Sequence, residues 1–183
     1  MQMSFSIPDA FTPAECARIV ELAGNAATRD AGLTGGVANH NLRRADITWL
    51  DEAEGAGWVM DRIIRLVADA NRDSFGFDLT EFAESPQVAR YGADRQGHFE
   101  WHADIGDGPV ARRRKLTMVV QLSPGEGYAG GRLELMADAN IREAPRDQGT
   151  ATLFPSFVLH RVTPVGEGER HSLTIWAHGP PFR

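Results

Sequence analysis

The sequence has only one cysteine, Cys16, among its 183 residues. A lone thiol excludes an intrachain disulfide and also excludes a metal cluster held by several thiolates. The chain lacks an apolar run of the length that a membrane-spanning helix needs, and its start, MQMSFSIPDAF, lacks the basic and apolar regions of a secretory signal. We therefore expect a cytoplasmic protein that does not enter a membrane.

Positive charge is also scarce. Lysine and arginine together number 19 against 25 aspartates and glutamates, which gives a formal net charge of −6. Because binding to nucleic-acid phosphates depends on clustered cations, this composition argues against nucleic acid as a partner. The dense basic run RRRK at 112–115 is interpreted as a solvated loop that precedes a strand.

Two helices are expected in the first half of the chain. Thr12, Pro13 and Glu15 have the spacing of a capping box with proline at the first helical position, which predicts a helix start. Apolar residues recur every three or four positions over 57–75, which predicts a second helix. The Gly-rich segment 30–41 between them is expected to be a mobile loop.

From residue 86 onward, short alternating or apolar runs are separated by Gly, Pro, Asp and Asn. The runs are QVARY, HFEWH, KLTMVVQL, RLELM, TATLF, HRVTPV and HSLTIWA. Strands at this spacing favour a jelly-roll sandwich or barrel. The predicted fold is therefore mainly β with flanking helices, in one domain over 1–183 with helical support over about 1–85 and a jelly-roll core over about 86–178.

The stretch HFEWHADIGDG, residues 98–108, concentrates histidines and acids in a chain with only six histidines. On a strand, alternation would place His98, Glu100, His102 and Asp104 on one face, with Phe99 and Trp101 on the other. A zinc-protease helix needs H-E-x-x-H, and H-F-E-W-H does not match it.

His102 and Asp104 in H-x-D order need at least one further ligand from another strand. Two histidines and one carboxylate on an open face are typical of non-haem iron oxygenases. The sequence LFPSFVLHRVTPV places His160 at the head of a later strand, and Arg170 follows it with a planar fork suited to a carboxylate. Taken singly, each of these features is weak, and their ordered combination carries the prediction.

The segments YGADRQGHFEWHAD, KLTMVVQLSPGEGYAGGRLEL and TLFPSFVLHRVTPVGEGERHSLTIW together resemble the prolyl-4-hydroxylase-like iron- and 2-oxoglutarate-dependent dioxygenases. Within that family they are similar to the bacterial PKHD-type hydroxylases. The resemblance covers about residues 43–178, and it implies a double-stranded β-helix. Agreement over several blocks in family order is more specific than any one motif.

By position, the resemblance implies that His102, Asp104 and His160 bind iron and are the catalytic residues. It implies that Arg170 binds the distal carboxylate of 2-oxoglutarate. The residues expected near the co-substrate are Tyr91, Thr174, Trp176 and Gln121, the last standing where some family members have a tyrosine. His98 is not expected to be a ligand.

The family activity implied is hydroxylation of an unactivated C–H bond, with Fe(II) as cofactor, 2-oxoglutarate and O2 as co-substrates and ascorbate as a reductant. The substrate expected is a prolyl or other residue of a peptide or protein, or a free small molecule. The segment 105–114, which has glycines, a proline and arginines, is predicted to be a flexible lid. A non-catalytic cupin-like metal-binding protein and a jelly-roll binding module remain as alternatives.

Overall fold

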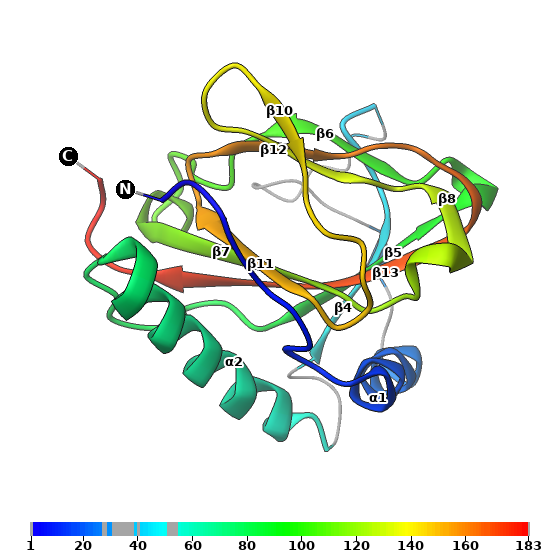
Figure 1. Ribbon diagram of the computed structural model, residues 1–183, viewed down its shortest axis with the longest axis horizontal. Helices are drawn as coiled ribbons and strands as arrows, with labels where there is room; N and C mark the ends of the chain where they lie inside the picture. The colour runs from blue at the N-terminus through cyan, green and yellow to red at the C-terminus, as the bar shows by residue number, and fades with distance from the viewer. Residues whose placement is uncertain (1, 27–28, 31–38, 40, 51–54, 183) are drawn as a thin grey trace.

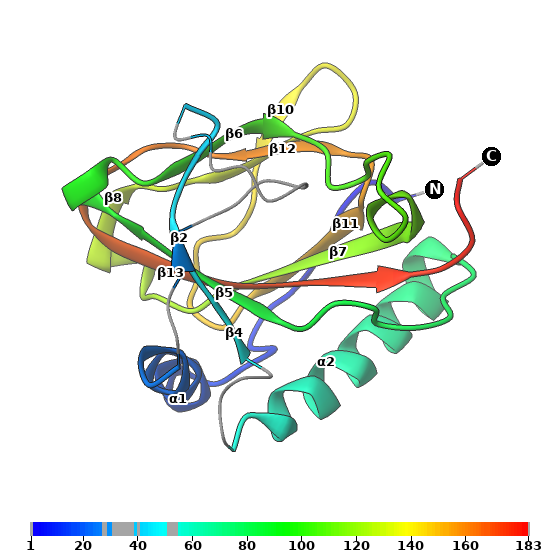
Figure 2. The same ribbon diagram turned by 180° about the vertical axis from the view of Figure 1, so that it is seen from behind.

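Two antiparallel β-sheets face each other in the computed structural model, and two helices cover the outer face of the larger sheet (Figures 1 and 2). The structure describes residues 2–26, 29–30, 39, 41–50 and 55–182. Most of the segment 30–41, which was expected to be a mobile loop, therefore lies outside the described residues. The predicted fold, mainly β with flanking helices, is confirmed.

The larger sheet has the order β1 (Phe5–Ile7), β11 (Ala151–Pro155), β7 (Arg114–Gln121), β13 (Val165–His178), β5 (Gln87–Gly92), β4 (Asp46–Trp49) and β2 (Arg29–Asp30), with β8 (Tyr128–Gly130) paired to β13. The smaller sheet has the order β10 (Ile141–Glu143), β9 (Leu133–Met136), β12 (Leu159–Val162), β6 (His98–His102) and β3 (Arg43–Arg44). The N-terminal part of the chain thus contributes strands to both sheets as well as helices.

The first main helix begins where the sequence predicts, and the second lies within the predicted range 57–75. In α1 (Pro13–Gly24), the Thr12 hydroxyl accepts from the Glu15 backbone N–H, and the Glu15 carboxylate accepts from the Thr12 N–H, so the capping box is present. Helix α2 (Gly57–Ala70) continues into a π-helical turn, η2 (Asn71–Phe75). Shorter 3-10 turns are η3 (Ala93–Arg95), η4 (Ala111–Arg113) and η5 (Gly125–Gly127).

The larger sheet contributes to two separate cores because side chains alternate along each strand. On β7, Leu116, Met118 and Val120 pack against the helices, whereas Thr117, Val119 and Gln121 face the smaller sheet. On β13 the same alternation places Leu173, Ile175 and Ala177 on the helix side. The side chains that point to the other side line a cavity between the sheets, and they are Arg170, Ser172, Thr174 and Trp176. The candidate site lies on that inner side.

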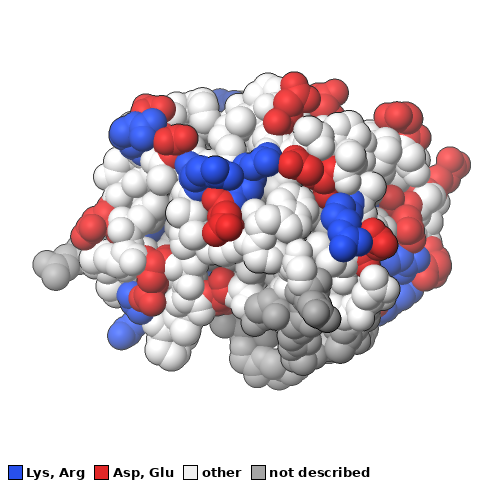
Figure 3. Space-filling view, turned by 90° about the horizontal axis from the view of Figure 1, so that it is seen from below, with Lys and Arg blue, Asp and Glu red and all other residues white. Residues whose placement is uncertain are grey.

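The face that carries the helices has an interspersed charge distribution. Figure 3 shows lysine and arginine side chains close to aspartates and glutamates on this face, with uncharged surface between them. Among the described residues, no helix has the length and apolar character that crossing a bilayer requires.

The packing of α2 predicts a sharp difference between two neighbouring isoleucines. Ile63 is 0% exposed in the core beneath the larger sheet, whereas Ile64 is 45% exposed. We expect Ile63→Ala to lower the free energy of unfolding by about 2–5 kcal/mol, because it leaves a cavity. Ile64→Ala, the matched control, should change it by less than about 1 kcal/mol. Urea denaturation measures both, and equal losses would contradict the assigned helix face.

Candidate metal centre

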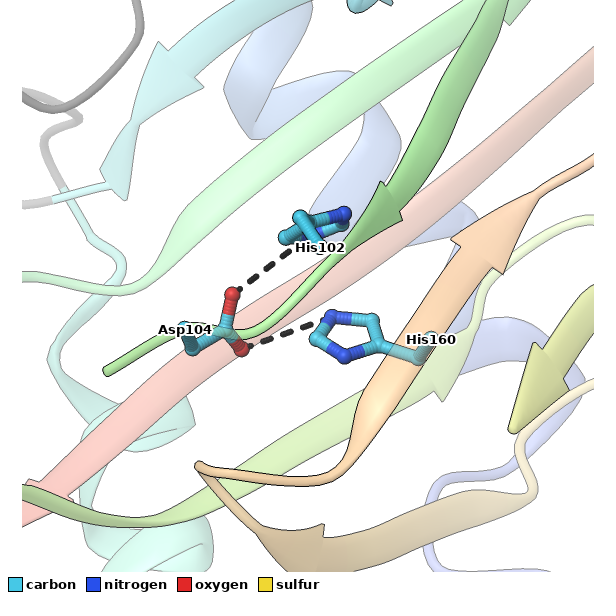
Figure 4. A group of neighbouring side chains, drawn as sticks. All are labelled: His102, Asp104 and His160. Atoms are coloured by element: carbon cyan, nitrogen blue, oxygen red, sulfur yellow. Dashed lines mark ion pairs between the residues drawn. The ribbon is translucent and has the colours of Figure 1, made fainter. Parts of the chain in front are cut away.

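Three candidate metal ligands converge between the sheets (Figure 4). His102 ends β6, Asp104 follows two residues later, and His160 lies on β12 directly opposite His102 in the strand pairing. One ligand atom from each side chain lies within 4.8 Å of the other two. The Nε2 atoms of His102 and His160 lie 3.4 and 3.5 Å from the two carboxylate oxygens of Asp104. The structure therefore brings together the three residues that the sequence selected.

Strand β6 does not alternate as the sequence analysis expected. Val162 pairs with Phe99, but His160 pairs with His102, so β6 has one extra residue between these two pairs. Such a β-bulge turns a side chain to the other face. The prediction that Phe99 faces away from His102 is therefore wrong, because their rings are stacked with centroids 3.5 Å apart.

Both histidines are oriented by their own strand. The Nδ1 atom of His102 lies 2.7 Å from the carbonyl of Glu100, and the Nδ1 atom of His160 lies 3.0 Å from the carbonyl of Val158. A carbonyl only accepts, so each Nδ1 carries the proton and donates it. In the neutral ring, Nε2 then has a free lone pair, which is the form that binds a metal. His98 differs, because both its ring nitrogens contact backbone carbonyls outside this group.

The Asp104 carboxylate is held by the opposite sheet. Its Oδ2 accepts from the Thr117 hydroxyl at 2.8 Å and from the Trp176 indole N–H at 2.9 Å. Burial alone raises the pKa of Asp104, but His160 and His102 outweigh it and hold the pKa of this carboxyl well below its usual range. The group is thus an oriented carboxylate anion.

His160 is the more buried of the two histidines, with 5% of its surface exposed. Burial lowers the pKa of its imidazole to about 4, although the attraction of Asp104 opposes this shift. At neutral pH the ring is therefore uncharged, as a metal ligand must be. Phe154 packs against it with ring centroids 4.7 Å apart.

Arg170 is fully buried in the same cavity as the three candidate ligands. Its Nε donates to the Oε1 atom of Gln121 at 3.0 Å. Its two terminal nitrogens have no hydrogen-bond partner among the described residues. Burial lowers the pKa of this guanidinium. Because unpartnered buried polar groups are costly, this arrangement indicates a site for an anion.

The other residues expected near a co-substrate lie around this cavity. Tyr91, Thr174 and Trp176 line it, and the Tyr91 ring centroid is 5.5 Å from the Arg170 guanidinium carbon. Gln121 does not line it. Its side-chain oxygen instead orients Arg170, a role that the residue type alone did not indicate.

Arg114 and Lys115, interpreted from the sequence as part of a solvated loop, belong to strand β7, so that interpretation is wrong for both. Lys115 is buried, and Arg114 is partly buried beside the site, with 11% of its side chain exposed. Arg114 begins β7, its Nη1 donates to the Asp104 carbonyl at 3.0 Å, and its guanidinium lies 3.9 Å from the Trp176 ring centroid. Its ion pair with Glu84 explains why Arg114 can lie partly buried. Glu84 also contacts the ring of His178. Burial raises the pKa of Glu84, but these two partners outweigh it and lower the pKa to about 2.

A groove of about 920 Å³ leads to the candidate ligands. Residues 106–111 form one border, which is part of the segment predicted to be a lid. The aromatic residues that line the groove are Trp49, Phe99, Trp101 and Trp176. A large compound or a chain segment therefore has access to the triad.

The 2OG-Fe(II) oxygenase superfamily model matches residues 86–178, just over half of the chain. A PKHD-type hydroxylase of Alteromonas mediterranea is 36% identical over 83 residues, a match that covers 43% of this chain but only 37% of that relative. A PKHD-type hydroxylase of Pseudomonas fluorescens is 28% identical over 95% of this chain and 77% of its own length. The crystal structure of a Pseudomonas putida prolyl-4-hydroxylase is similar with a TM-score of 0.74 and 26% identity, covering 98% of this chain and 94% of that one.

The Trp176 indole is expected to support metal binding through Asp104. In Trp176→Phe the carboxylate loses one donor while the aromatic ring is kept, so we expect affinity for Co(II), an oxygen-stable probe ion, to fall about 10- to 100-fold. Trp58→Phe is the matched control, because Trp58 packs on Phe11 in the helix core. Equal affinities of both variants in a calorimetric titration would refute the supporting role.

The lowered pKa of His160 predicts acid sensitivity of the metal-free protein. The His160 imidazole binds a proton near pH 6.5 in the unfolded chain but only near pH 4 in the folded chain. The stability contributed by the neutral ring is therefore complete above about pH 6.5 and is lost as the pH falls toward 4. Burial shifts His171 in the same direction. Urea midpoints should therefore fall across this window, and less steeply in His160→Gln. An unchanged slope in that variant would show that His160 does not cause the loss.

Proposed function

Since the chain belongs to the 2OG-Fe(II) oxygenase superfamily, we propose that it hydroxylates a C–H bond, with His102, Asp104 and His160 as iron ligands and Arg170 as the 2-oxoglutarate anchor. Fe(II), 2-oxoglutarate and O2 are the cofactor and co-substrates of this family. The observation that carries the proposal is the fully buried Arg170, whose unpartnered terminal nitrogens share a cavity with the triad.

The residues present fit Fe(II). Two imidazole nitrogens with free lone pairs and one ionised carboxylate are the donor set of the two-histidine, one-carboxylate iron sites, which keep coordination positions open. The hydrogen bonds to the histidine Nδ1 atoms and to Asp104 fix the three side chains before a metal binds.

The residues also fit 2-oxoglutarate. A carboxylate matches the planar guanidinium of Arg170, and a buried charge-assisted pair of this kind is strong and directional. Gln121 holds the guanidinium without neutralising it, so the positive charge stays available for the co-substrate. Tyr91 and Thr174 border the space beside it.

When bound, Fe(II) with 2-oxoglutarate and O2 supplies the oxidising power that inserts oxygen into a C–H bond while 2-oxoglutarate becomes succinate and carbon dioxide. The protein's residues orient these reactants and exclude water. Trp176 lines the cavity, Phe154 packs against the ring of His160, and Phe99 covers one face of His102. The predicted lid at 105–114 borders the groove and is proposed to cover a bound substrate.

We propose that the substrate is an amino-acid residue in a peptide or protein. The size of the groove and its tryptophan side chains suit an extended segment better than a compact metabolite. The Pseudomonas putida neighbour is named as a prolyl-4-hydroxylase, which supports proline as the first residue to test. A cytoplasmic location is part of the proposal, since Cys16 is a free, buried thiol.

A cupin-like protein that only binds metal would retain the triad but would have no use for Arg170. The anaerobic protein with Fe(II) and 2-oxoglutarate should develop the visible charge-transfer band of the chelate. We expect His160→Ala to abolish the band. Arg170→Gln should weaken 2-oxoglutarate binding at least 10-fold, because a charge-assisted pair becomes a neutral contact.

Arg132→Gln is the control variant for this titration, because Arg132 is half-exposed, does not line the cavity or the groove, and forms ion pairs only with Glu134 and Glu143 among the described residues. It should bind 2-oxoglutarate like the parent. If circular dichroism shows that Arg170→Gln is unfolded, Arg170→Lys replaces it and should also bind 2-oxoglutarate more weakly. Bound iron without any chelate band in the parent would favour the metal-binding protein over the oxygenase.

A further inference from the structure

Arg43 is a second buried arginine of the site, and neither the sequence analysis nor the proposed reaction gives it a role. It lies on β3 opposite Phe99 of β6, and it is only 8% exposed. Its guanidinium carbon is 4.7 Å from the centroid of the Phe99 ring, which in turn stacks on His102. Arg43 lines both the inner cavity and the groove, so it stands where a substrate would approach the triad.

The contacts of Arg43 repeat those of Arg170. Its Nη2 donates to the Oε1 atom of Gln87 at 2.7 Å, just as Arg170 donates to Gln121. Its Nε is buried and has no partner among the described residues, and no salt bridge joins it to a carboxylate there. In both cases an amide orients a buried guanidinium without neutralising it. A buried charge in this state is costly until an anion meets it.

The charges of the loaded site indicate which anion is missing. The negative charges of Asp104 and the two carboxylates of 2-oxoglutarate balance the positive charges of Fe(II) and Arg170. The Glu84–Arg114 ion pair has no net charge. Two further acids, Glu100 and Asp107, line the groove, but neither forms an ion pair with Arg43 among the described residues, so its charge has no carboxylate partner at the inner end of the groove. 2-Oxoglutarate therefore does not account for it.

We infer that Arg43 binds a carboxylate of the substrate, so that the hydroxylated residue is presented next to a terminal carboxylate or an aspartate or glutamate side chain. This inference rests on the proposed function, because it concerns the substrate of the same site. A guanidinium fixed at Nη2 by Gln87 and stacked on Phe99 is preorganised for such a group. The neutral partner Gln87 is essential to this role.

The test uses the anaerobic protein loaded with Fe(II) and 2-oxoglutarate, and the probes are matched acids and amides. One pair is a pool of N-acetyl amino acids with all standard side chains and the corresponding pool of primary amides. The other pair is Ac-X-Asp-NH2 against Ac-X-Asn-NH2, which separates a side-chain carboxylate from a terminal one. Quenching of tryptophan fluorescence reports binding, because Trp49, Trp101 and Trp176 line the groove.

In the parent protein we expect one acid pool to bind about 10- to 100-fold more tightly than its amide partner, the range of a charge-assisted hydrogen bond. Gln87→Glu is the decisive variant. It places a carboxylate beside Arg43 while retaining the hydrogen bond, so it should remove the preference for acids even if Arg43 also has a packing role. Arg43→Gln should remove it as well. Arg44→Gln, which changes the adjacent partly exposed arginine, should keep it.

Several outcomes would overturn the inference. They are equal binding of acids and amides by the parent, no saturable binding of any acid pool, and an acid preference that survives in Gln87→Glu. If Arg43→Gln does not fold, Gln87→Glu alone decides. Loss of the chelate band in the parent would refute the proposed function, whereas a normal band without acid preference would refute only the role of Arg43.

Discussion

The buried, charged carboxylate of Asp104 links the two sheets. Its backbone continues β6 of the smaller sheet, but its side chain accepts from Thr117 and Trp176 of the larger one. An ionised carboxylate in this position is tolerable only because hydrogen-bond donors hold it. The spacing between the sheets, the rotamer of Trp176 and the direction of the histidines are therefore coupled to one anion.

Much of the fold could be predicted from residue patterns because they encode local geometry. The capping box at Thr12 and the alternation of β7 and β13 both follow from short-range rules, and both are present. The pairing of His102 with His160 could be anticipated only through family-like order of motifs. The distance between them depends on strands that are far apart in the sequence.

The residues that the sequence did not reveal depend on tertiary contacts. The bulge in β6 is set by pairing with β12, so no pattern within HFEWH shows that Phe99 lies beside His102. Arg114 belongs to a basic run, and its partly buried position depends on partners distant in the sequence, Glu84 about thirty positions earlier and Trp176 far along the chain. Gln121 and Gln87 look like ordinary polar strand residues until each is seen holding a guanidinium.

The metal centre depends on the register of strand β7 in the larger sheet and not only on which residues the strand contains. Leu116, Met118 and Val120 belong to the helix core, whereas Thr117 contacts Asp104 and Gln121 contacts Arg170. A slip of one position would exchange these two sets and bury Thr117 and Gln121 among leucines. The apolar packing of the helices against β7 therefore also selects the strand register. Only a chain folded in this register has the side chains of the metal site in place.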